Sequence, residues 1–152
     1  MTRMPALPLF PAARLLPGVL LVLLASAGGT ARAQEPARIQ PAALLAAPER
    51  HVGRALRLDG LACVDTGGAG FACTWENGER VLSLSAPGLG GRTRPTVAAR
   101  LAGTCRGADN LRLRECRFSV VVRPVNAAKG IVNAGERRRP LVTLYAREID
   151  LF

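Results

Sequence analysis

The sequence predicts an all-β protein: a small closed barrel of five to six short strands, preceded by a short helix and stapled by disulfides. Three observations predict it. Apolar and polar residues alternate in several short segments, turn residues separate these segments at regular spacing, and four cysteines fall in two neighbouring pairs. Phase slips within two of the segments predict bulges, which allow a small sheet to curl onto itself.

The first 33 residues have the layout of a secretory signal peptide. Arg3 and Arg14 make its start positive, Leu15–Ala25 is apolar, and Ala31-Arg32-Ala33 is a small-residue cleavage site. The apolar stretch is shorter than the about 20 residues that span a bilayer. We therefore expect cleavage before Gln34, a mature chain without a transmembrane segment, and a periplasmic or secreted location.

The mature chain is strongly basic. Three of the 21 Lys and Arg residues lie in the leader and none of the 11 acidic residues does, which leaves 18 basic residues against 11 acidic ones. The remaining length fits one domain. The charge favours acidic partners such as anionic lipid headgroups, polysaccharides or nucleic acid.

The barrel domain is expected to occupy residues 54–152, after a lead with a short helix at residues 34–53. Proline at the start and after the end of Pro41–Ala47 predicts the helix. Arg54–Val64 alternates as a first strand, and its apolar phase shifts by one residue at Gly60. A glycine at such a phase shift predicts a bulge.

A tight hairpin is expected next. Cys73 and Trp75 lie on one face of the second strand, and Asn77-Gly78 is a strong signal for a two-residue turn. Folding about this turn would place Trp75 opposite Arg80 and Cys73 opposite Leu82. The apolar residues of both strands then share one face, with Trp75 near the rim of the barrel.

The second half of the chain is expected to add further strands. Thr96–Cys105 alternates as a fourth strand, and Leu111–Val122 as a fifth with a bulge near Arg114-Glu115. Residues 123–140 are predicted to form a mobile basic connector, because the segment is longer than most ordered loops. Leu141–Phe152 alternates again and is expected to be a terminal strand.

The four cysteines are Cys63, Cys73, Cys105 and Cys116, and each neighbouring pair flanks a predicted turn. In an exported protein they are expected to form disulfides. Four cysteines allow three pairings, and adjacency of the predicted strands favours the two local ones. The alternative is a zinc site, but the spacings lack the C-x-x-C knuckle typical of zinc, so no metal is expected.

We expect neither an enzyme nor a cofactor. His51 is the only histidine, and a serine or cysteine nucleophile would depend on it, but it lies in a turn. Glu76 and Glu79 flank a tight turn, where solvated side chains explain them better than acid–base catalysis does. An enzyme centred on His51 is the least favoured alternative.

The segments Val52–Gly60, Ala99–Cys105 and Leu111–Cys116 resemble the anticodon-binding-like OB-fold family (tRNA_anti-like), found in small exported bacterial proteins. The resemblance implies a five-stranded OB-like barrel with no established chemistry. The chain departs from the family pattern in the additional pair Cys63 and Cys73 and in its C-terminal strand. Its segment between the third and fourth strands also looks too short for the usual OB helix.

The expected function is that of a binding module without catalysis, with a protein or an envelope component as partner. The alternative is binding of an oligonucleotide or another polyanion through an arginine-rich groove, as in other OB folds. Nucleic acid is disfavoured, because few rings are available and an exported protein seldom meets it. The candidate contact residues are Trp75, Arg80, Arg92, Arg94, Arg112, Arg114 and Arg117.

Overall fold

The computed structural model describes residues 35–135 and 137–152. The signal peptide predicted for residues 1–33 lies outside the described residues. None of the helices in the described ranges combines the length and the apolar character needed to cross a membrane.

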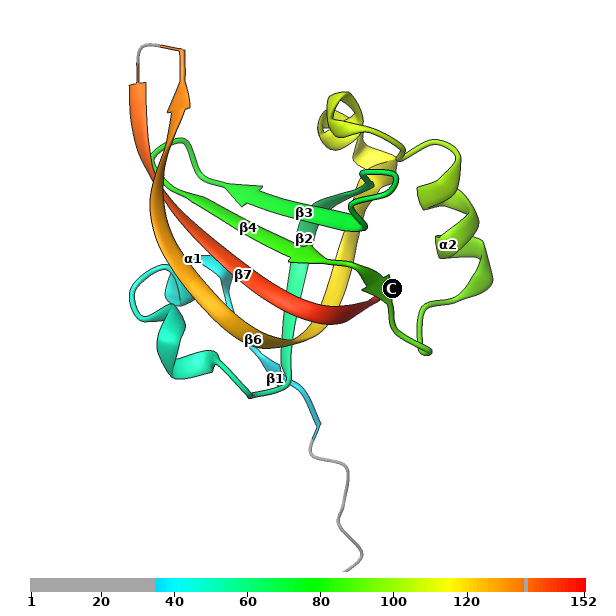
Figure 1. Ribbon diagram of the computed structural model, residues 1–152, viewed down its shortest axis with the longest axis horizontal. Coiled ribbons are helices and arrows are strands. Elements are labelled where there is room, and N and C mark those ends of the chain that lie inside the picture. The colour runs from blue at the N-terminus through cyan, green and yellow to red at the C-terminus, as the bar shows by residue number, and fades with distance from the viewer. Residues whose placement is uncertain (1–34, 136) are drawn as a thin grey trace, which may run out of the picture. The chain divides into compact units, whose positions relative to one another are not determined.

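Five strands form a closed, OB-like barrel (Figure 1). Each is hydrogen-bonded to two others, in the cyclic order β2–β3–β4–β7–β6–β2, and all five contacts are antiparallel except that between β4 and β7. The predicted all-β barrel is therefore confirmed. The strands are β2 (Leu56–Asp65), β3 (Phe71–Glu76), β4 (Val81–Ala86), β6 (Arg117–Ala134) and β7 (Arg137–Leu151).

Short elements flank and connect these strands. β1 pairs in parallel with β2, and β5 pairs in parallel with β7. The predicted N-terminal helix begins at Pro41, where proline has no hydrogen bond to lose, but it ends at Leu44. The short elements are β1 (Ala37–Arg38), α1 (Pro41–Leu44), the 3-10 helix η1 (Pro48–His51), β5 (Gly88–Leu89), α2 (Pro95–Ala102), and the 3-10 helices η2 (Ala108–Arg112) and η3 (Arg114–Cys116).

β2 carries the bulge that was predicted at Gly60. The register between β2 and β6 shifts between Leu58 and Leu61. Gly60 has a φ of 76°, in the left-handed region that glycine adopts without a steric penalty. Because the bulge inserts one residue, Leu58 and Leu61 both belong to the fully buried core although they are three positions apart.

The β3–β4 hairpin has a longer loop than predicted. Trp75 lies opposite Leu82 and not opposite Arg80, so the register is displaced by two residues. The Asn77 side chain accepts hydrogen bonds from the backbone N–H groups of Glu79 and Arg80, which closes a four-residue loop. A displacement of two residues preserves the face of each side chain, so the apolar faces still coincide.

The predicted fourth strand is wrong, because most of Thr96–Cys105 forms α2. Pro95 occupies the first turn of this helix, and the helix buries Val97 and Leu101. Residues at i and i+4 share a face of a helix, and they also share a face of a strand, so alternation alone could not separate the two. The segment between the third and fourth barrel strands therefore does hold a helix.

The structure also corrects the next two segments. The first part of Leu111–Val122 forms 3-10 turns, so β6 begins only at Arg117 and the expected bulge near Arg114-Glu115 is absent from it. Residues 123–134 form the far part of β6 and residues 137–140 the start of β7, paired as far as Ala134 opposite Arg137, where an irregular connector was expected.

Both disulfides have the local pairing, Cys63–Cys73 and Cys105–Cys116, and all four residues are buried. Cys63 and Cys73 are directly opposite residues of β2 and β3, with Cα atoms 4.0 Å apart. The second bond does not join two strands, because it links the turn after α2 to the end of η3, with Cα atoms 5.5 Å apart. Two buried disulfides indicate an oxidising, extracytoplasmic environment.

Candidate binding groove

A cleft of about 320 Å³ lies between β3, η2 and the β6–β7 hairpin, and we call it the Trp75 groove. Its walls come from segments far apart in the sequence, so only the closed barrel assembles it. The lining residues are Ala62, Thr74, Trp75, Glu76, Val81, Ala108, Leu111, Arg112, Arg117, Val132 and Arg139.

Three predicted contact residues meet in this groove. Trp75 is half-buried and packs against the core while it also lines the groove. Arg112 is exposed at the end of η2, and Arg117 is exposed at the start of β6. The Nη1 of Arg117 donates a hydrogen bond of 3.2 Å to the carbonyl oxygen of Gly60, so the bulge of β2 helps to place this guanidinium.

Arg139, one of the basic residues of the predicted connector, also lines this groove. Its Nη1 donates to Oε2 of Glu76 at 2.7 Å, and its side chain is only 19% exposed. Its Nε is buried and has no hydrogen-bond partner among the described residues. An unpaired buried donor costs free energy. The period-two pattern of the terminal strand, continued backwards, would have placed Arg139 and Arg138 on opposite faces.

The chemistry of the Trp75 groove suits an anion that carries an apolar or planar group. Three guanidinium groups face one carboxylate, so the lining has a positive excess. Guanidinium forks bind carboxylate or phosphate oxygens through paired hydrogen bonds. The indole of Trp75 offers a flat apolar surface beside them.

The other four predicted contact residues lie elsewhere. Arg80 borders a separate depression with Leu45. Arg94 is exposed at the N-terminal cap of α2, and Arg114 is exposed in η3. Arg92 belongs to a second cleft, in which it forms an ion pair with Asp150.

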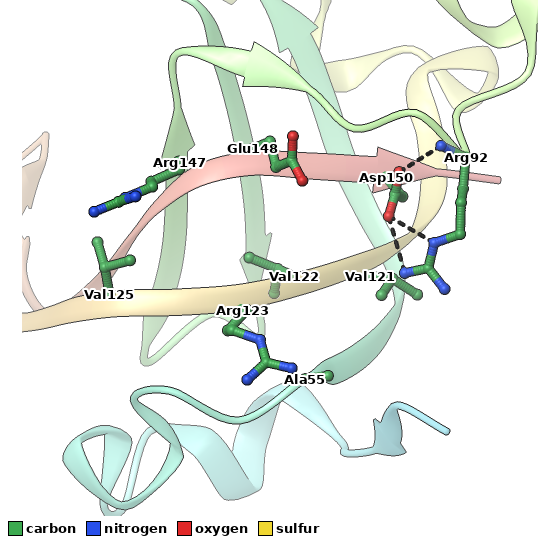
Figure 2. A pocket seen from close by; sticks show the side chains of 9 residues that line it. All are labelled: Ala55, Arg92, Val121, Val122, Arg123, Val125, Arg147, Glu148 and Asp150. Carbon is green, nitrogen blue, oxygen red and sulfur yellow. Dashed lines mark hydrogen bonds and ion pairs between the residues drawn. The ribbon is translucent and has the colours of Figure 1, made fainter. Parts of the chain in front are cut away.

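This second cleft, of about 460 Å³, lies between β6, β7 and the chain that enters β2 (Figure 2). The Nε and Nη2 of Arg92 both lie 2.9 Å from Oδ2 of Asp150, and the Arg92 backbone N–H donates to Oδ1 at 2.9 Å. Arg123 donates to the carbonyl oxygen of Gly53 at 2.8 Å, and Arg147 points away from the ion pair. Arg92 therefore fastens the segment after β5 to β7, and Asp150 neutralises its charge.

Asp59 ties three strands together on the barrel surface. Its carboxylate accepts hydrogen bonds from Ser119 Oγ of β6 at 2.6 Å, from Arg38 Nε of β1 at 2.7 Å and from Arg57 Nε of β2 at 3.2 Å. The Ser119 hydroxyl, followed by the two arginines, lowers the pKa of Asp59 from its ordinary value. The cluster has a structural role.

Residues for other kinds of site were also located. His51 ends η1, and its Nδ1 is buried without a hydrogen-bond partner within the described ranges. Across residues 35–135 and 137–152, no group of three or more His, Cys, Asp or Glu side chains is placed to hold a metal ion.

Comparisons with known proteins give little further information. No family model matches the chain, and no curated protein matches it. Among solved structures, the chain is similar to a protein described as an aspartyl-tRNA synthetase from Leishmania major Friedlin, with a TM-score of 0.38 and 12% sequence identity. The similarity covers 80% of this chain but 22% of that protein, so the chain spans about a fifth of its length.

Proposed function

We propose that this chain is an exported, non-enzymatic binding module of the OB type that holds a protein or an envelope component in the Trp75 groove. The observation that most supports the proposal is the convergence of Trp75 with Arg112, Arg117 and Arg139 around one cleft. We also propose kinship with the anticodon-binding-like OB-fold family, which rests on the three sequence segments that resemble it.

Physical chemistry favours an acidic group of the partner as the part that enters the groove. A carboxylate or phosphate there would meet the positive excess of the lining, and guanidinium groups bind such oxygens through paired hydrogen bonds. The apolar part of the partner would lie against Trp75.

A second candidate function is the binding of an oligonucleotide or another extended polyanion. The same three arginines favour it. However, binding of single-stranded nucleic acid uses several rings on which successive bases stack, whereas Trp75 is the one aromatic residue in the lining of this groove. This candidate therefore ranks second.

The test is a titration of the mature chain with three probes: a heparin fragment, a thymidine oligonucleotide and an acidic peptide. The groove variant is Arg112→Glu with Arg117→Glu, and the matched control is Arg94→Glu with Arg114→Glu, which changes the net charge equally outside the groove. We expect the groove variant to weaken binding of the preferred probe by at least about tenfold and the control by less than about threefold.

The probe and its salt dependence separate the two candidates. A steep loss of oligonucleotide affinity with salt, reduced in the groove variant, would favour the polyanion function. Equal losses in the groove variant and the control would contradict both, because binding would then depend on net charge alone.

A further inference from the structure

β6 is paired on both sides only in its first part. Its last pair with β2 is Val122 opposite Leu56, and beyond this point β6 pairs with β7 alone as far as Ala134. No strand in the described ranges covers the other edge of residues 127–134. The hairpin extends past the ends of β3 and β4 (Figure 1). An uncovered edge offers a row of backbone donors and acceptors to another strand.

The register shows which backbone groups face this edge. Ile131 lies opposite Pro140, which has no N–H, so these two residues cannot exchange a pair of hydrogen bonds. In an antiparallel ladder, the N–H and C=O of such a residue point away from the partner strand. The groups of Ile131 therefore point outward, and by alternation so do those of Lys129 and Asn133.

A side-chain contact supports this assignment and marks where the open edge begins. The N–H of Ala127, two residues before Lys129, donates a hydrogen bond of 2.8 Å to Oδ1 of Asn126. The Nζ of Lys129 then lies 3.4 Å from a carboxylate oxygen of Glu49 in η1. From Lys129 to Asn133, no backbone hydrogen bond other than those of the β6–β7 ladder occurs in the described structure. Three outward-facing residues are thus available.

The two faces of the hairpin define what a docked strand would touch. On one face, Ile131 is 58% exposed, and the exposed Arg138 lies opposite Asn133. On the other face, Val132 and Arg139 are opposite one another and both line the Trp75 groove. A strand added to this edge would place its alternate side chains beside Ile131 and toward the groove.

The charge of the hairpin selects the occupant. Arg137 and Arg138 are exposed and take part in none of the ion pairs of the described residues, whereas Lys129 is already held by Glu49. A second copy of this basic chain would bring like charges together, which disfavours pairing between two such edges. An extended segment with acidic side chains would meet the exposed guanidinium groups of Arg137 and Arg138.

We propose that the edge of β6 from Lys129 to Asn133 accepts an extended acidic strand of a partner protein by β-strand addition. The proposal rests on the proposed function and deepens it, because it specifies the chemistry of the partner. Backbone hydrogen bonds at Lys129, Ile131 and Asn133 supply affinity. Selectivity comes from the side chains of the partner strand, in which apolar and acidic residues alternate.

The probe is a capped seven-residue peptide of alternating Glu and Val. A peptide with the same side chains but N-methylated on alternate residues is the control, because it keeps the charge and blocks strand pairing. We expect the first peptide to bind at least about tenfold more tightly than the second. In the wild-type chain, we expect it to slow hydrogen exchange at the amides of Lys129, Ile131 and Asn133.

Substitutions at Ile131 test the edge from the protein side. Ile131→Pro removes an outward donor without removing a bond of the β6–β7 ladder, so proline is tolerated there as on other edges. We expect Ile131→Pro to weaken peptide binding about tenfold and Ile131→Val to change it less than about twofold. If Ile131→Pro perturbs the fold, the exchange measurement on the wild type decides.

The outcomes are distinguishable. Equal binding of the two peptides, no binding of either, or unprotected amides at the edge would overturn the strand-addition proposal. If only the groove proposal fails, the double substitution of Arg112 and Arg117 by Glu leaves peptide affinity unchanged, while Ile131→Pro still lowers it. If only strand addition fails, the groove variant loses the affinity and Ile131→Pro keeps it.

Discussion

The two disulfides close loops of nearly equal length in regions that are built differently. Cys63–Cys73 and Cys105–Cys116 span sequence separations of 10 and 11 residues. The first joins strands whose ladder already sets the two residues opposite one another. The second closes a segment of turns and 3-10 helices, which is tied to β2 by two backbone hydrogen bonds at Asp65.

The comparison teaches that equal covalent constraints have unequal consequences. In the chain-entropy account, each bond removes a similar amount of freedom from the unfolded chain, worth about 3 kcal/mol. For Cys63–Cys73, the hydrogen bonds between β2 and β3 hold the folded backbone, so loss of the disulfide leaves the folded state unchanged. The full entropy gained by the unfolded chain then lowers the free energy of unfolding. In the segment closed by Cys105–Cys116, few strand pairs hold the native backbone, so loss of the disulfide also loosens the folded state. The freedom gained by the folded state offsets part of the loss in free energy of unfolding. The same loosening disturbs the groove wall that holds Arg112.

The largest expected effect is on stability, from replacement of the barrel disulfide. Cys63→Ala with Cys73→Ala is expected to lower the free energy of unfolding by about 3 kcal/mol or more, because the unfolded chain gains freedom and buried sulfur atoms are lost. Denaturant unfolding of the oxidised proteins measures it. Binding to the Trp75 groove should be unchanged at low temperature, and a weakened groove would contradict the comparison.

A smaller loss of stability with a larger loss of binding is expected for the other disulfide. Cys105→Ala with Cys116→Ala releases the segment that carries Arg112, so affinity for the groove ligand should fall about tenfold. The same titrations as for the groove variant measure it. Retained affinity would show that the backbone ties at Asp65 hold the wall without the sulfur bond.

A non-covalent tie provides the next test. Asp150→Asn keeps the shape of the side chain but removes the charge that Arg92 grips, so it should lower stability by about 1–2 kcal/mol. The shift in Tm measures it. Glu148→Gln removes a neighbouring exposed charge and should shift Tm by clearly less, and comparable shifts would mean that the Arg92 contact contributes little.

The smallest expected effect is a pH dependence. Because the pKa of Asp59 is lowered in the folded state, its contribution is complete above its ordinary value of 3.8 and is lost as the pH falls through the folded pKa. The stability difference between wild type and Asp59→Asn should therefore shrink in acid. Ser119→Ala, which removes the main cause, should reproduce most of the effect. A difference that is constant with pH would contradict this origin.

The first half of the barrel could be predicted because its signals are local. The alternation of β2, the glycine at its phase slip and the turn at Asn77-Gly78 each reflect a rule that acts over a few residues. The register at this turn was displaced by two residues, because the Asn77 side chain closes a larger loop than a two-residue turn.

The second half was predicted less well because its signals are ambiguous. The spacing of Val97 and Leu101 fits a strand and a helix equally. The contact of both side chains with the core of the barrel, which a local pattern does not reveal, decides between the two. No described residue of the β6–β7 hairpin between 128 and 140 is fully buried, so no apolar alternation marks the hairpin, and its arginines are typical of a loop. Trp75, Arg112 and Arg117, three of the candidate contact residues, come together in the Trp75 groove, whereas the position of Arg139 beside them depends on barrel closure.

Hydrogen exchange of the two disulfide variants, followed by mass spectrometry over residues 103–116, tests the central claim most directly. Loss of Cys105–Cys116 is predicted to speed exchange in this segment while β2, β3 and β4 stay protected. Loss of Cys63–Cys73 is predicted to leave amide exchange in this segment as slow as in the wild type, except for exchange through global unfolding, which becomes faster because the whole protein is less stable. Equal local acceleration in both variants, or in neither, would contradict the account.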